Sequence, residues 1–105
     1  MRANEFVKSN PWLLKENMKE MKGIISDANN MKFFCLNNQL GHSYSNHGGG
    51  VAISIDDLKR LVDSHELVEK HGGLGSAKDE YFSCVQNNEP ASYIAKAIAD
   101  VESCQ

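Results

Sequence analysis

Residues 31–44 read MKFFCLNNQLGHSY, and this stretch decides the predicted fold. The side chains of Met31–Leu36 alternate between two faces, as they do in a β-strand. Asn37-Asn38 is typical of a two-residue turn, so Gln39–Tyr44 is expected to return as an antiparallel neighbour. Val51–Ile55 is expected to form a third strand. The pattern therefore predicts a three-stranded antiparallel meander.

One helix is predicted before these strands. Ser9 or Asn10 can cap it, and Pro11 suits its first turn because the first helical N–H groups have no partner within the helix. Asn29-Asn30 is expected to end the helix, since asparagine tolerates a left-handed backbone. Apolar residues at spacings of four and three place one stripe on it: Leu14, Met18, Met21, Ile25 and Ala28. Residues 1–9 are expected to be a loosely ordered lead-in.

Three helices are predicted after the strands. The first begins at a capping box, Ser54 to Asp57, and ends at Gly72-Gly73. Ser76 is expected to cap the next, whose apolar face comprises Ala77, Tyr81, Cys84 and Val85. That helix ends at Asn87-Asn88, and Pro90 starts the last one. The predicted fold is a single α+β domain over 1–105: an N-terminal helix, the meander and three C-terminal helices.

The length of 105 residues fits one domain and excludes the large enzyme architectures. No apolar run approaches the roughly 18–20 residues that span a bilayer, so no membrane partner is expected. The first residues, MRANEFVKSNPW, lack the apolar segment of a signal peptide, which predicts a cytoplasmic protein. Three cysteines without CxxC spacing are expected to be reduced thiols rather than a disulfide framework.

The charge is unevenly distributed along the chain. The net charge is −3, but residues 1–22 carry five Lys/Arg and three Glu, a net of +2, and the remainder carries −5. The overall sign disfavours direct binding to nucleic acid, which only the basic first helix would support. A partner of the remaining residues is expected to present positive charge.

Two glycine-rich stretches resemble catalytic or ligand-binding motifs only in part. His47-Gly48-Gly49-Gly50 matches the oxyanion motif of esterases, but the sequence has no G-x-S-x-G elbow to supply a nucleophile. Residues 72–78, GGLGSAK, follow a predicted helix and lack the spacing of a phosphate-binding loop. We interpret the first as a flexible loop between strands and the second as the end of one helix and the start of the next.

A metal site is the alternative prediction. Cys35, His42 and His47 carry side chains that bind zinc, and the two histidines have a spacing seen in zinc fingers. A structural site needs four ligands, so Cys84 or Cys104 would have to supply the fourth. The alternative function is therefore a metal- or ligand-binding protein or enzyme centred on Cys35, His42 and His47. The other interpretation is a buried Cys35 and two polar loop histidines, with no metal or cofactor.

The C-terminal half of the sequence resembles a family. The stretches DLKRLVDSHELVEKHGGLGSAKDEYF, residues 57–82, and ASYIAKAIADVESCQ, residues 91–105, resemble small accessory proteins from early operons of lambda-like phages and prophages. The resemblance covers about half of the chain. It implies a dispensable, non-enzymatic protein that acts on host machinery, for example a nuclease or an immune system.

These observations predict a protein that binds and inhibits or modulates a host protein in the host cytoplasm without catalysis. The expected partner-binding residues are acidic and lie in helix starts and on one helix: Asp56, Asp57, Asp63, Asp79 and Glu80. A homodimer is expected to use the first predicted helix through Trp12, Leu14, Met18, Met21 and Ile25. The loop of His47, Gly48, Gly49 and Gly50 is expected to be mobile, since glycine has the largest backbone freedom.

Overall fold

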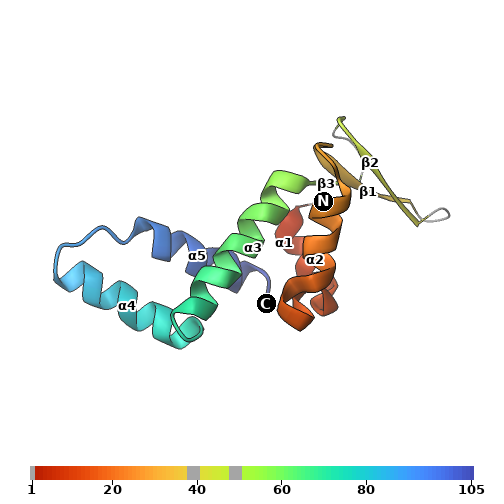
Figure 1. Ribbon diagram of the computed structural model, residues 1–105. Helices are drawn as coiled ribbons and strands as arrows, with labels where there is room; N and C mark the ends of the chain where they lie inside the picture. The colour runs from red at the N-terminus through yellow and green to blue at the C-terminus, as the bar shows by residue number, and fades with distance from the viewer. Residues whose placement is uncertain (1, 38–40, 48–50) are drawn as a thin grey trace. The chain divides into compact units, whose positions relative to one another are not determined.

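The computed structural model describes residues 2–37, 41–47 and 51–105 (Figure 1). In these ranges the chain forms helices, then the three strands of one antiparallel sheet, then further helices, which confirms the α+β class. The chain divides into two compact units, Met1–Val62 and Asp63–Gln105. We call them the N-terminal unit and the C-terminal unit and describe each by itself. The single domain over 1–105 stays a prediction.

The sheet is built from β1 (Phe33–Asn37), β2 (Gly41–Ser45) and β3 (Ala52–Ser54). Its strand order is β2-β1-β3, so β1 is central, whereas a meander would place the second strand in the middle. The central position suits β1, whose sequence FFCLN is the most apolar of the three strands. The predicted strands are therefore present, but the predicted neighbour order is wrong.

The register of the sheet places Phe34 between two apolar partners. Phe34 lies opposite Tyr44 in β2 and opposite Ile53 in β3. The rings of Phe34 and Tyr44 have centroids 5.6 Å apart, and Ile53 is completely buried. Asn37 pairs with Gly41, so three residues connect β1 and β2 and the predicted two-residue turn is wrong. A two-residue turn would have placed Gly41 opposite Phe34 and removed Tyr44 as its cross-strand partner.

The first residues form a helix, α1 (Ala3–Ser9), which corrects the predicted loose lead-in. Ala3, Phe6 and Val7 are spaced as one helix face, and all three are buried. The ring of Phe6 lies 5.7 Å from that of Phe34 in β1. This contact anchors α1 in the core of the N-terminal unit. A helix this short is not stable in isolation, so packing of this kind is what stabilises it.

The single helix predicted from Pro11 is interrupted. A 3₁₀ turn, η1 (Pro11–Leu14), precedes α2 (Lys15–Asp27), and the backbone of residues 16–18 is left-handed, with φ between 52° and 62°. Successive left-handed residues other than glycine are sterically costly. The helix ends as predicted, because Asn29 and Asn30 adopt positive φ angles after it.

Helix α3 (Ile55–Lys70) begins at the predicted cap. The backbone N–H of Asp57 donates to the Ser54 hydroxyl oxygen, at an N–Oγ distance of 3.3 Å. Residues of α3 up to Val62 belong to the N-terminal unit, and those from Asp63 belong to the C-terminal unit. In the N-terminal unit the helix contributes buried residues: Ile55, Leu58, Leu61 and Val62.

The predicted helix ends in the C-terminal unit are confirmed by their backbone geometry. After α3, Gly72 has a φ of 96°, and the N–H of Gly73 donates to the Val68 carbonyl at 3.0 Å. After α4 (Leu74–Gln86), Asn88 has a φ of 57°, and the N–H of Glu89 donates to the Cys84 carbonyl at 2.8 Å. Both arrangements satisfy helix carbonyls that otherwise lack a partner.

Two helix starts differ from the prediction. Helix α4 begins at Leu74, with Gly73 at the capping position, so Ser76 lies inside the first turn. Helix α5 (Ser92–Ser103) begins two residues after Pro90. The core of this unit combines small and branched side chains: Val68, Ala77, Cys84, Ala91, Ile94, Ala97, Ile98 and Val101. Among the residues that the structure describes, no helix is both long and apolar enough to cross a membrane.

Candidate interaction surface

The acidic residues predicted to bind a partner fall into two groups. Asp56 and Asp57 lie in the first turn of α3, in the N-terminal unit. The carboxylate of Asp57 is 3.3 Å from the guanidinium of Arg60, and this ion pair offsets part of its charge. Asp63, Asp79 and Glu80 are exposed and belong to the C-terminal unit. The predicted patch at the start of α3 is thus divided between the two units, whereas the predicted patch of Asp79 and Glu80 belongs entirely to the C-terminal unit.

The net charge follows this division closely. Residues 63–105 contain eight Asp/Glu and three Lys/Arg, a net charge of −5, whereas residues 1–62 contain six and eight, a net of +2. The entire negative balance of the protein therefore resides in the 43 residues of the C-terminal unit. A dense charge of one sign attracts oppositely charged surfaces and accelerates association with them.

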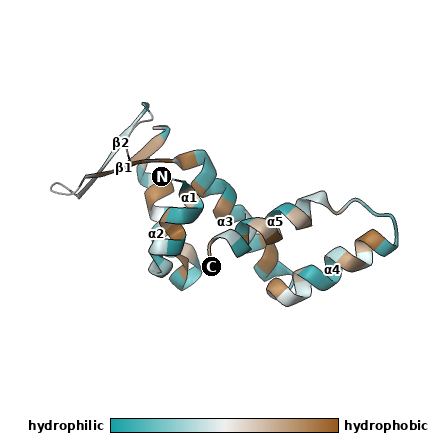
Figure 2. Cartoon of the chain, turned by 180° about the vertical axis from the view of Figure 1, so that it is seen from behind, coloured by the Kyte–Doolittle hydropathy of each residue, from teal (hydrophilic) through white to brown (hydrophobic). Residues whose placement is uncertain are grey.

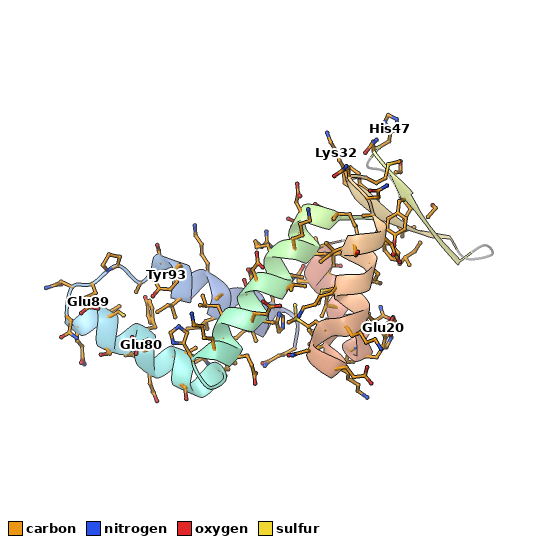
Figure 3. All side chains as sticks on the ribbon, viewed as in Figure 1. Glu20, Lys32, His47, Glu80, Glu89 and Tyr93 are labelled. Carbon is orange, nitrogen blue, oxygen red and sulfur yellow. The ribbon has the colours of Figure 1, made fainter. Side chains whose placement is uncertain are left out.

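Helix α4 and the residues just after it carry an acidic cluster. Glu80 lies on α4, and Glu89 lies beyond the end of the helix (Figure 3). The Cys84 thiol donates to a Glu80 carboxylate oxygen over 3.8 Å. Burial, and then the charges of Glu80 and Glu89, raise the pKa of the Cys84 thiol. Glu89 was not predicted from the sequence, because it lies close to Cys84 only through the backbone turn that ends α4.

The same helix exposes large apolar side chains. Phe82 is 63% exposed and Val85 is 50% exposed. Val85 had been predicted to belong to the apolar face with Tyr81 and Cys84, so its exposure corrects that prediction. Phe82 was not assigned to any face of the helix from the sequence. Phe82 directly follows Tyr81, and consecutive residues of a helix point in different directions, so its exposure could have been predicted from the sequence.

The predicted dimer residues are distributed over the interior and the surface of the N-terminal unit. Met18 and Met21 are buried within the single chain, whereas Leu14 and Ile25 are half-buried and Trp12 is 48% exposed. The left-handed backbone of residues 16–18 explains why the predicted stripe does not lie on one helix face. A homodimer stays a prediction, and the accessible part of its predicted surface is centred on Trp12.

The residues of the alternative metal site are described only in part. Cys35 is half-buried in β1 and lies opposite Ser43, whereas the backbone of His42 lies opposite Leu36. His47 is exposed, and its backbone N–H donates to the Ser45 hydroxyl at 3.0 Å. Gly48, Gly49 and Gly50 lie outside the described residues, so the mobility of that loop stays a prediction. Within the described part of the chain, no three His, Cys, Asp or Glu side chains are grouped to hold a metal ion.

Comparison of the chain with protein-family models, with curated protein sequences and with solved structures finds no match.

Proposed function

We propose that this protein binds and modulates another protein through the acidic surface of its C-terminal unit, without catalysing a reaction. The observation that carries the proposal is the confinement of the negative balance, −5, to residues 63–105. A partner with a basic surface, such as an enzyme that holds DNA or RNA, would be attracted by this charge. The resemblance of the C-terminal half to phage accessory proteins agrees with a host target in the cytoplasm, a nuclease or a defence component.

The location of the charge refines the set of residues that the sequence suggested. Asp79 and Glu80 lie on α4 in the acidic unit, and Glu89 joins them there. Asp56 and Asp57 lie in the unit whose net charge is +2, and Asp57 is paired with Arg60. We therefore assign the principal role in partner binding to the carboxylates of α4 and its end.

Charge reversal tests this assignment. A triple variant, Asp79→Lys, Glu80→Lys and Glu89→Lys, would be compared with wild type in affinity capture from bacterial lysate at low and moderate salt. The expected result is loss of the captured protein and of the salt sensitivity of capture, since surface attraction is screened by salt. A matched variant reverses three carboxylates of the N-terminal unit: Glu5, Glu20 and Asp27.

The control decides how a loss is interpreted. It changes the net charge of the whole chain by the same amount as the α4 variant, so an effect of net charge alone would appear in both. The proposal requires that the control retain capture. Equal capture by wild type and by the α4 variant would show that the acidic surface of the C-terminal unit does not bind the partner.

A further inference from the structure

We draw no further inference here: the strongest candidate, the exposed apolar face of α4 at Phe82 and Val85 (Figure 2), carries none, because nothing in the structure shows what covers it.

Discussion

The hydroxyl of Ser64 on α3 donates a hydrogen bond to the Asp100 carboxylate on α5, at an Oγ–Oδ2 distance of 2.7 Å. The two residues are 36 positions apart in the sequence, and Ser64 is buried. Buried polar groups are costly unless they are paired, so this bond is a specific link between two helices of the C-terminal unit.

Removal of this link is expected to destabilise the protein. Ser64→Ala should lower the free energy of unfolding by about 1–2 kcal/mol, because the lost bond has a charged acceptor. Urea unfolding followed by circular dichroism would measure the change. Ser83→Ala removes an exposed hydroxyl from α4 and should change stability by less than about 0.5 kcal/mol. An equal effect of the two substitutions would show that the Ser64–Asp100 bond contributes nothing specific.

Two glycines a few residues apart are expected to respond to alanine in opposite directions. Gly72 has a φ of 96°, and a Cβ there would lie 3.3 Å from the Ser76 hydroxyl oxygen, so Gly72→Ala should cost about 1 kcal/mol. Gly75 lies inside α4 with open space around a Cβ, and Gly75→Ala should stabilise by up to about 1 kcal/mol. Thermal unfolding would show a lower and a higher midpoint, respectively. A shift of the same sign in both variants would contradict the left-handed helix end at Gly72.

The left-handed segment at the start of α2 predicts a stabilising glycine. Glu16 has a φ of 52° and is exposed, so Glu16→Gly should relieve steric cost and raise stability by up to about 1 kcal/mol. Glu20, an exposed residue of α2 outside the left-handed segment, is the matched control. Glu20→Gly should destabilise by about 1 kcal/mol. Trp12, the one tryptophan of the chain, lies in this unit, so its fluorescence during urea unfolding is a suitable measurement. A destabilised Glu16→Gly protein would contradict the left-handed conformation.

The environment of Tyr44 predicts a loss of stability at high pH. Burial, and then the charge of Asp27, raise the pKa of Tyr44 above its ordinary value of 10.0. Above pH 10 the unfolded chain therefore releases this proton first, and the free energy of unfolding falls as the pH rises toward the folded pKa. Unfolding experiments from pH 8 upward should show a shallower decline for Tyr44→Phe than for wild type. Identical declines would show that Tyr44 does not contribute to the pH dependence.

Local patterns in the sequence were sufficient for much of the fold. The cap at Ser54, the ends at Gly72 and Asn88, and the strand-forming character of residues 33–36 depend on backbone preferences of single residues and their immediate neighbours. Such preferences act over a few positions and can be read without knowledge of the tertiary contacts. The α+β class followed from them, as did the uneven charge, which is a property of the sequence itself.

Tertiary contacts decided what these patterns left open. The helix over Ala3–Ser9 exists because Phe6 meets Phe34, and the central position of β1 follows from the partners that Phe34 finds in both neighbouring strands. On α4, Glu89 approaches Cys84 only through the helix end, and the exposure of Phe82 and Val85 depends on which face the other helices cover. These features depend on contacts between residues that are distant in the sequence. The free energy of such contacts depends on the surface area that they bury, and local periodicity in the sequence does not specify that area.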